Sequence, residues 1–391
     1  VAATRGTATE ALDQFAVPAI GLGGRVEGGS DIGAAELRIG ADWRDVSGNT
    51  QEYFSYTAGV AQRFRKAGGD STTLGGYAEV SANIGNLLAT GGIRLDKYWI
   101  GEGRLRETQL SNGALLTNSI FAPRSGTEWT GRAGLNWSPG NDIGLRASAY
   151  RGWRLPTLNE LYRPFRVGTD AIAANAALRP EVMNGFEAGI IWGHKGERLR
   201  AGRYVEITAF HNVLKDAIAN VTLGQGPGNY PGVGFVAAGG TYKQRQNLPR
   251  LRSNGIEASA GMPIGPLAFE LAGSMVDARI TDGALAGKRP AQVPKYSGTA
   301  SLAWRPDAYQ GISISMRYAG GQFEDDLNQL RLADAVTLEI NAMWRVSSGM
   351  QLMLRGENLF DTRVEAAVSS NDVIERAMPR TIWAGIRFAI E

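Results

Sequence analysis

The sequence predicts an all-β fold: a transmembrane antiparallel β-barrel of the outer-membrane type, with long extracellular loops and short periplasmic turns. Three patterns predict it. Apolar residues alternate with small or polar residues in repeated segments, short and long connections alternate between these segments, and aromatic residues gather at the segment ends. Together these patterns are typical of strands that have one face in lipid and the other in water.

The alternation is clearest in four segments, in which one face carries charge and the other carries none: 73–84, 143–150, 336–345 and 381–388. Successive side chains of a strand point to opposite faces, so each segment would have an apolar side and a polar side. A soluble β-sandwich alternates as well, because its inner faces form a core. The alternation alone therefore leaves lipid-facing and core-facing strands both open.

Connection lengths favour the membrane barrel. Short turns are expected at 138–142, 263–266, 305–310 and 347–349. Much longer connections lie between them, at 101–125, 153–184, 222–252, 279–296, 319–334 and 359–378. Alternation of short and long connections is expected of an outer-membrane barrel, and we expect about sixteen strands, an even number that permits a closed barrel.

Aromatic residues mark both ends of the predicted strands. Four tryptophans end a segment just before a short turn, namely Trp137, Trp192, Trp304 and Trp344. Another group marks the opposite rim, namely Tyr98, Trp99, Trp153 and Tyr318. Two aromatic girdles are a property of membrane barrels, whereas in a soluble β-protein such rings are more often core residues.

Composition excludes several other classes of protein. A membrane-spanning helix needs about 20 consecutive apolar residues, and the best run, 16–24, is short and interrupted by Pro18. The formal charge of +3 over 391 residues is too small to indicate a nucleic-acid partner. The absence of cysteine excludes disulfides, thiol nucleophiles and cysteine-based metal sites.

No motif indicates an enzyme, a cofactor or a metal site. His194 and His211 are too isolated to form a histidine-based site, and no serine, histidine and aspartate form a recognisable nucleophile motif. The triplet Glu324-Asp325-Asp326 offers oxygen ligands. Three consecutive side chains do not converge easily on one ion, so we expect a solvated acidic loop tip there.

At 150–162, the sequence YRGWRLPTLNELY resembles the mid-barrel signature of TonB-dependent outer-membrane receptors, the siderophore-receptor-like β-barrels. Further similar elements follow in the family's order: LRPE at 178–181, GFEAG at 185–189, NGIE at 254–257, RGENLFD at 355–361, and the closing strand at 380–388. Each element is weak alone. Their order and spacing from Asp13 onward make the resemblance specific to this family.

The resemblance implies import of a scarce ligand, by default a ferric siderophore, across the outer membrane of a Gram-negative bacterium. It implies no cofactor of the protein itself, since the ligand carries the iron. It implies the TonB–ExbB–ExbD complex as an energy-coupling partner, contact with outer-membrane lipid and lipopolysaccharide, and a monomer. Two alternatives remain: a plugless passive porin-like channel, and a surface receptor for a phage or protein partner.

The sequence departs from the family's pattern in two places. Family members begin with a plug domain and an energy-coupling box, and the plug sits within a barrel of twenty-two strands. Here Leu12-Asp13-Gln14-Phe15 already resembles an early barrel segment. We therefore expect residues 1–391 to form a single, incomplete β-barrel domain without the plug, or a plugless relative. The end also departs, because Phe388 is followed by three more residues where the family ends on an aromatic.

Candidate ligand contacts lie in the long connections. The segment 222–252 contains no acidic residue, and its cations lie beside aromatic rings. Such a set suits an anionic, partly aromatic ferric chelate, through charge-assisted hydrogen bonds and stacking; binding to lipopolysaccharide phosphates or to neighbouring carboxylates is the alternative. The candidate residues are Arg163, Arg166, Tyr230, Phe235, Tyr242, Lys243, Arg245 and Arg250.

We expect the residues of the family-like motifs to be structural. The carboxylates Glu160, Glu181, Glu187 and Glu257 should pair with arginines such as Arg154, Arg163 and Arg179, because an unpaired charge on the lipid face is costly. Asn358 and Asp361 should shape a strand exit through hydrogen bonds from side chain to backbone.

Overall fold

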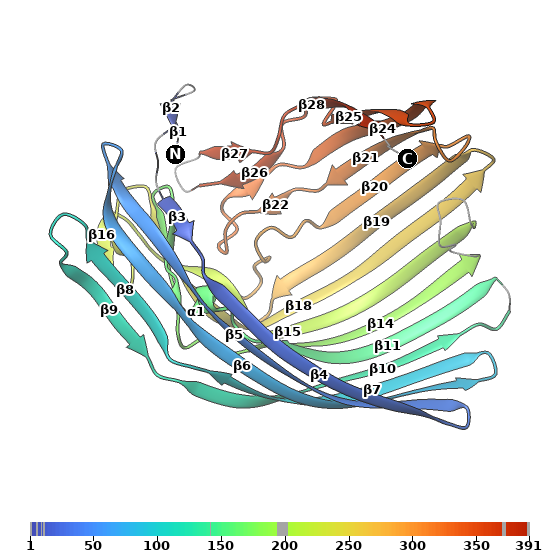
Figure 1. Ribbon diagram of the computed structural model, residues 1–391, viewed down its shortest axis with the longest axis horizontal. Coiled ribbons are helices and arrows are strands. Elements are labelled where there is room, and N and C mark those ends of the chain that lie inside the picture. The colour runs from blue at the N-terminus through green and yellow to red at the C-terminus, as the bar shows by residue number, and fades with distance from the viewer. Residues whose placement is uncertain are drawn as a thin grey trace.

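A computed structural model describes residues 2–4, 7–8, 10, 12–140, 142–193, 202–369 and 373–388. One large antiparallel sheet curves around a hollow, and a short helix, α1 (Leu158–Tyr162), lies among the loops at one end (Figure 1). Within the described ranges, no helix is long and apolar enough to span a membrane.

Fifteen described strands form the wall: β4 (Ala19–Ile32), β5 (Ala35–Thr57), β6 (Val60–Ile84), β7 (Leu87–Ile100), β10 (Arg124–Trp137), β11 (Ile143–Arg154), β14 (Glu181–Gly193), β15 (Tyr204–Gln225), β18 (Thr241–Ile264), β19 (Leu267–Ile280), β20 (Tyr296–Trp304), β21 (Gly311–Ala319), β24 (Ala335–Ser347), β25 (Met350–Glu357) and β28 (Thr381–Phe388). Shorter strands lie at the ends of the wall: β1 (Ala2–Thr4), β2 (Thr7–Ala8), β3 (Leu12–Ala16), β8 (Gly103–Gln109), β9 (Leu115–Phe121), β12 (Phe165–Val167), β13 (Asp170–Ala173), β16 (Gly228–Tyr230), β17 (Gly234–Val236), β22 (Gln322–Phe323), β23 (Arg331–Leu332), β26 (Glu365–Val368) and β27 (Ile374–Arg376).

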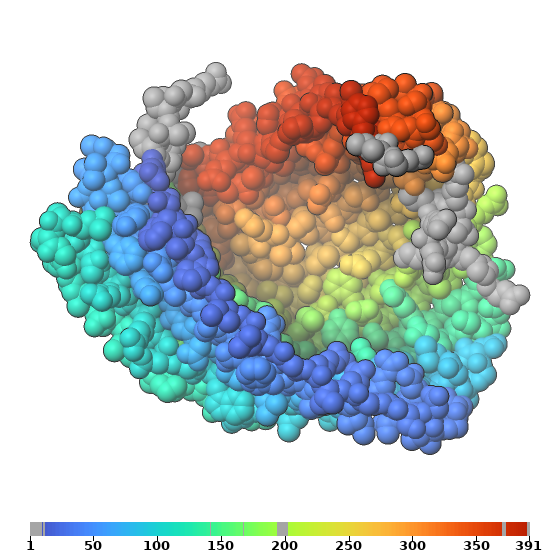
Figure 2. All heavy atoms as spheres, in the orientation of Figure 1, coloured from blue at the N-terminus to red at the C-terminus, as the bar shows by residue number. Residues whose placement is uncertain are grey.

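Each wall strand pairs antiparallel with the next one along the chain, which makes a continuous meander. β4 pairs with β5 and β28 pairs with β25, and no ladder joins β4 to β28 in the part of the chain that is described. Figure 2 shows the hollow of the sheet between these two edge strands, dark blue and dark red. The wall therefore has one strand fewer than the sixteen expected.

The two faces of the wall differ as the alternation predicts. On one face the large apolar side chains are exposed, as at Ile93, Leu95 and Leu271, where 62%, 60% and 59% of the residue is accessible. In a soluble sandwich these same residues would be buried in a core. Their exposure on one continuous face fits strands that meet lipid, and confirms the membrane-barrel interpretation of the sequence.

The short turns are where the sequence predicts them. They join β10 to β11, β18 to β19, β20 to β21 and β24 to β25. Trp137 and Trp192 lie at that end with about half of their surface exposed, as a girdle requires. At the loop end the expected aromatic girdle is less clear, because Tyr98 and Trp153 pack on each other with ring centroids 5.5 Å apart.

Several of the expected loops contain strands, and in two of them a strand continues the pairing of the wall. Within 101–125, β8 and β9 form a hairpin that extends the sheet, with β8 pairing to β6. Within 222–252, residues from Thr241 onward belong to β18, which pairs with β15 far beyond the length that a bilayer requires. Above the lipid both faces of a strand meet water, so the apolar alternation that marks a membrane strand is lost there.

Aromatic rings on the polar face lie across glycines of the neighbouring strand. In each pair the two residues are direct partners in the ladder, and a Cβ added to the glycine would overlap the ring: Tyr77 with Gly40, Tyr98 with Gly126, Tyr150 with Gly185, Tyr204 with Gly261 and Phe210 with Gly255. Glycine here provides the space for the ring, and the ring covers backbone that glycine leaves bare.

Candidate ligand-binding site

Most of the candidate ligand residues come together at the loop end. β13 pairs in parallel with β18, so that Ala171 lies opposite Tyr242. The ring of Tyr242 stacks on Tyr230 at 4.6 Å, and Arg166 donates to the carbonyl oxygens of Val233 and Phe235 at 2.6 and 2.8 Å. The connections 163–173 and 226–242 therefore pack on each other.

The candidate cations bind groups of the protein itself. Arg245 is buried against the ring of Phe165 and donates to the carbonyl oxygens of Asn159 and Arg163 at 2.8 and 2.7 Å. Burial lowers the pKa of Arg245 to about 10, which leaves it charged at neutral pH. Lys243 lies 3.9 Å from Asp170. These contacts give both side chains a role in holding the loops.

Besides Arg166, which is exposed but bonds two carbonyl oxygens, two further candidate residues lie toward solvent. Phe235 is 58% exposed. Arg250 lies away from the packed loops, half-exposed, with its Nε 3.5 Å from a carboxylate oxygen of Asp282. Unlike the buried Arg245, both side chains have accessible surface to offer to a ligand.

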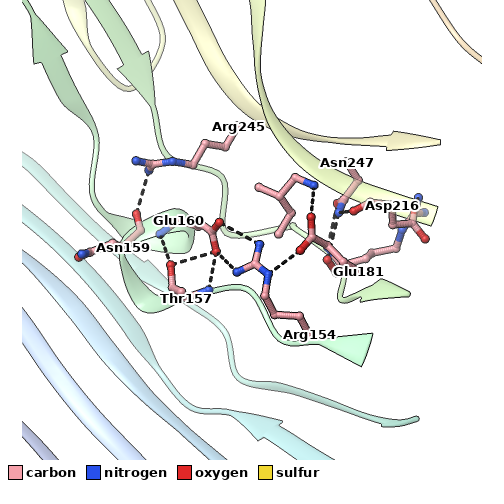
Figure 3. A network of polar contacts seen from close by, with 10 residues as sticks. Arg154, Thr157, Asn159, Glu160, Glu181, Asp216, Arg245 and Asn247 are labelled. Atoms are coloured by element: carbon pink, nitrogen blue, oxygen red, sulfur yellow. Dashed lines mark hydrogen bonds and ion pairs between the residues drawn. The ribbon is translucent and has the colours of Figure 1, made fainter. Parts of the chain in front are cut away.

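The family-like motif at 150–162 builds a clamp around α1, shown in Figure 3. Thr157 caps the helix: its hydroxyl accepts from the N–H of Glu160 at 3.2 Å, and its own N–H donates to the Glu160 carboxylate at 2.7 Å, a capping box. Arg154 binds Glu160 through two bonds of 2.9 and 3.0 Å and also binds Glu181. Glu181 in turn accepts from the N–H of Ile218. One arginine thus ties α1 to β14 and β15.

The expected pairing of motif carboxylates with arginines is confirmed for Glu160 and Glu181. The other arginines have different partners: Arg179 pairs with Asp216, and Arg163 pairs with Glu52. Glu187 accepts a hydrogen bond of 3.0 Å from the hydroxyl of Tyr150. The expectation for the strand exit is also confirmed, because Asn358 bonds both ways with the backbone of Thr362, and Asp361 accepts from the N–H of Arg380.

The clamp around α1 is expected to loosen in acid. Burial alone would raise the pKa of Glu160, but the bonds from Arg154 and Thr157 outweigh it and hold the pKa below its ordinary value. A carboxyl with a lowered folded-state pKa contributes stability above its unfolded pKa of about 4.3 and loses it as the pH falls through the folded value. Hydrogen exchange at the α1 amides should therefore accelerate as the pH falls below about 4, relative to the intrinsic rate.

Glu160→Gln is the control for the acid response. It keeps the size of the side chain but removes its titration, so α1 should exchange faster at neutral pH and show no further acid-dependent opening. An unchanged acid response in Glu160→Gln would assign the titration to another group.

A buried ionic cluster beside this clamp has no signature in the sequence. Glu52 of β5 is fully buried and accepts from the Nε of Arg163 at 2.6 Å and from Arg65 of β6 at 3.3 Å. Arg65 also bonds Glu107 of β8 at 2.6 Å and the carbonyl of Pro164 at 2.7 Å. The β5–β6 pairing places Arg65 opposite Glu52, and the loop that follows α1 brings Arg163 to them from far along the chain.

The acidic triplet at 324–326 is not the solvated loop tip that the sequence predicted. Asp325 and Asp326 are each only 6% exposed. Asp326 accepts from the N–H and the hydroxyl of Thr222 at 2.8 and 2.7 Å, and Asp325 accepts from two backbone N–H groups of its own loop. The expected solvated tip is therefore wrong, because these carboxylates cap backbone donors and join the loop to β15.

A cavity of about 720 Å³ lies among these groups at the loop end. Apolar side chains of β15, β18 and β19 line it together with charged groups from the loops. The charged lining consists of seven carboxylates, Glu160, Asp170, Glu181, Glu324, Asp325, Asp326 and Glu375, and two cations, Lys243 and Arg245. Its volume is within the range of small-molecule sites.

A larger hollow, of about 1020 Å³, extends along β25 and β28 from the turn residue Arg305 to Glu357 and Met378. It borders the sheet edge that β28 forms, and none of the predicted ligand residues lines it, so we place the candidate site in the loop-end cavity, which Lys243 and Arg245 line.

No group of three or more histidine, aspartate or glutamate side chains in the described ranges could hold a metal ion. His211 bonds the side chain of Asn254, and His194 lies outside the described residues.

Comparison with known proteins gives a family model, "TonB dependent receptor-like, beta-barrel", that matches residues 4–359. The chain is 25% identical over 231 residues to the iron-regulated outer membrane virulence protein of Vibrio cholerae serotype O1. This alignment covers 57% of this chain and 34% of the relative. The chain is 22% identical over 362 residues to the ferrienterobactin receptor of Escherichia coli K12, and this alignment covers 84% of this chain and 43% of that receptor.

Among solved structures, the ferric yersiniabactin uptake receptor of Yersinia pestis matches with a TM-score of 0.70 at 15% identity, over 95% of this chain and 54% of that receptor. At this identity the likeness concerns the fold. The chain thus spans less than half the length of these two curated relatives.

Proposed function

The chain belongs to the TonB-dependent receptor β-barrel family, and from this we propose that it is the barrel part of an outer-membrane transporter that imports a ferric siderophore or a similar iron chelate. The family and the fold are those of transporters and receptors in the outer membrane of Gram-negative bacteria. The observation that carries the proposal for this chain is the cavity at the loop end of a wall whose outer face is apolar.

We further propose that the TonB–ExbB–ExbD complex drives the transport. The iron-regulated and ferrienterobactin-receptor relatives support iron as the cargo. The protein supplies the barrel wall, the loops that hold the ligand and the polar inner face, while the ligand carries the iron.

The test of this function is uptake of radioactive ferric chelates by cells that contain the full-length protein. Energised import should stop when a protonophore collapses the proton-motive force. Uptake that continues without energy would instead support a passive channel, and binding without any uptake would support a surface receptor.

We propose that the packed loops at 163–173 and 226–245, together with Arg250, position the ligand. Arg250→Ala is expected to lower ligand affinity a few-fold with the barrel intact, because its half-exposed guanidinium can offer N–H donors to chelate oxygens. Arg245→Ala is expected to lower affinity as well, by loosening the loops that Arg245 joins.

Proteolysis of the loops separates the two effects. Arg245→Ala should expose the loops to protease, whereas Arg250→Ala should leave them as resistant as in the wild type. Unchanged affinity of both variants for every ferric chelate tested would remove these residues from the site.

A further inference from the structure

The loop-end cavity carries a large formal excess of negative charge. Its lining contains seven carboxylates and two cationic side chains. Arg154, bound to Glu160 and Glu181, adds one more positive charge beside it. Lys243 and Arg245, which the sequence suggested as contacts for an anionic ligand, are thus outnumbered by carboxylates in the lining of the cavity.

The excess comes from carboxylates of the lining that no described cation pairs with. Lys243 and Arg245 lie on β18, near Asp170 and Glu160. The other four lining carboxylates, Glu324, Asp325, Asp326 and Glu375, form no ion pair with a cation among the described residues. Glu324 accepts from the amide of Gln292, and Asp325 and Asp326 accept from N–H and O–H groups, all of which are neutral donors.

Most of the remaining lining is apolar. Ala217, Leu248 and Ile280 are buried members of one hydrophobic cluster, and all three line the cavity. Charges beside such a surface are weakly screened, so an anion brought here would be repelled more strongly than in water. A cation or a neutral ligand with apolar surface would meet complementary charge and complementary area.

On the basis of the proposed function, we infer that the chelate taken by this cavity is neutral or cationic, a ferric hydroxamate-type complex rather than a ferric catecholate. Iron(III) neutralises the hydroxamate groups that bind it, and a free amine on such a ligand makes the complex cationic. Catecholate groups leave the iron complex a trianion, whose charge has the same sign as the excess in the lining.

The test uses the full-length protein in detergent and measures binding of two probes, cationic ferrioxamine B and trianionic ferric enterobactin. Ferrioxamine B should bind more tightly. In the Glu324→Gln/Glu375→Gln variant, its affinity should fall about tenfold, and the affinity for ferric enterobactin should rise, because two charges of the lining are removed.

Asp31→Asn is the matched control, since Asp31 is an exposed carboxylate of β4, next to the short turn at the opposite end of the wall. It should leave both affinities unchanged. Added salt should weaken ferrioxamine B binding to the wild type more than to the Glu324→Gln/Glu375→Gln variant.

The outcomes separate this inference from the proposed function. Tighter binding of ferric enterobactin by the wild type would overturn the inference and leave ferric-chelate import standing. Equal changes in Asp31→Asn and in the Glu324→Gln/Glu375→Gln variant would also overturn it, because the effect would then be one of overall charge. If no ferric chelate of either kind binds or is imported, the proposed function falls and the inference falls with it.

Discussion

Replacing Glu52 by Ala is expected to detach the loops from the extended strands at the loop end. Glu52 is fully buried between Arg65 and Arg163, and its loss leaves two cations without their shared carboxylate. Removing one partner of a buried ion pair typically costs about 3–5 kcal/mol, since the remaining charge stays uncompensated. Because Arg163 follows α1 directly, the connection 154–181 should lose its ion pair to β5. It should keep the bond from Arg65 of β6 to the Pro164 carbonyl.

The measurement is limited trypsin digestion of the full-length protein in outer-membrane fractions. Cleavage within the loops should become much faster in Glu52→Ala while the membrane-embedded wall stays resistant. Adding Arg163→Met to Glu52→Ala should restore part of the resistance, because Arg163 then no longer leaves a charge without its carboxylate. Arg65 keeps its ion pair with Glu107 in both variants.

Glu36→Gln serves as the control, since Glu36 lies on the same strand and pairs with Arg38 in an exposed ion pair. Such pairs contribute little, so its digestion should match the wild type. Equal protection of wild type and Glu52→Ala would show that the cluster does not hold the loops.

Gly68→Ala is expected to prevent most of the protein from assembling. Gly68 pairs with Asn49 in the β5–β6 ladder, at the point where β5 leaves β4 and begins to pair with β3. An added Cβ would overlap the carbonyl oxygen of Gly48 and the Cα of Asn49. Both are backbone atoms that no rotamer change can move, so the substitution should cost on the order of 3 kcal/mol.

The comparison variant is Gly76→Ala, because Gly76 lies eight positions after Gly68 on the same face of β6. There the nearest atom to an added Cβ is the carbonyl oxygen of Gly40, at an ordinary 3.9 Å. Both substitutions reduce the conformational freedom of the unfolded chain to the same extent. The difference in the yield of folded barrel between the two variants therefore reports the cost of the steric overlap. Folded barrel, assayed by its mobility in unheated gel samples, should be normal in Gly76→Ala and scarce in Gly68→Ala. Equal yields would refute the close-packing argument.

Local patterns were sufficient to predict the wall. The period-two alternation around residues 73–84 and 336–345 marks strands because lipid accepts only apolar side chains, whatever the partner strand is. The short turns were predictable for the same local reason, since glycine, proline, asparagine and aspartate supply the backbone angles that tight turns need. The capping box of Thr157 and Glu160 is local as well, with a spacing of three residues, but from the sequence we expected Glu160 only to pair with an arginine.

What the sequence could not give depends on contacts between distant segments. Glu52 and Arg163 look like ordinary surface charges until the loop after α1 folds onto β5. Asp326 looks solvated until its loop folds over Thr222 of β15. Arg245 looked available to a ligand because the segment 222–252 contains no acid, but its guanidinium binds carbonyl oxygens, which carry no signal in a sequence.

The rings that lie across glycines have a consequence for how the sheet finds its alignment. A slip of one residue between β5 and β6 would send the polar face into lipid. A slip of two would keep the faces but place the Tyr77 ring against Arg38 or Asp42, the neighbours of Gly40 on the same face, instead of the bare glycine backbone. The same holds for Tyr150 at Gly185 and for Tyr204 at Gly261. Each pair of ring and glycine therefore favours the observed register of its two strands over a register shifted by two residues.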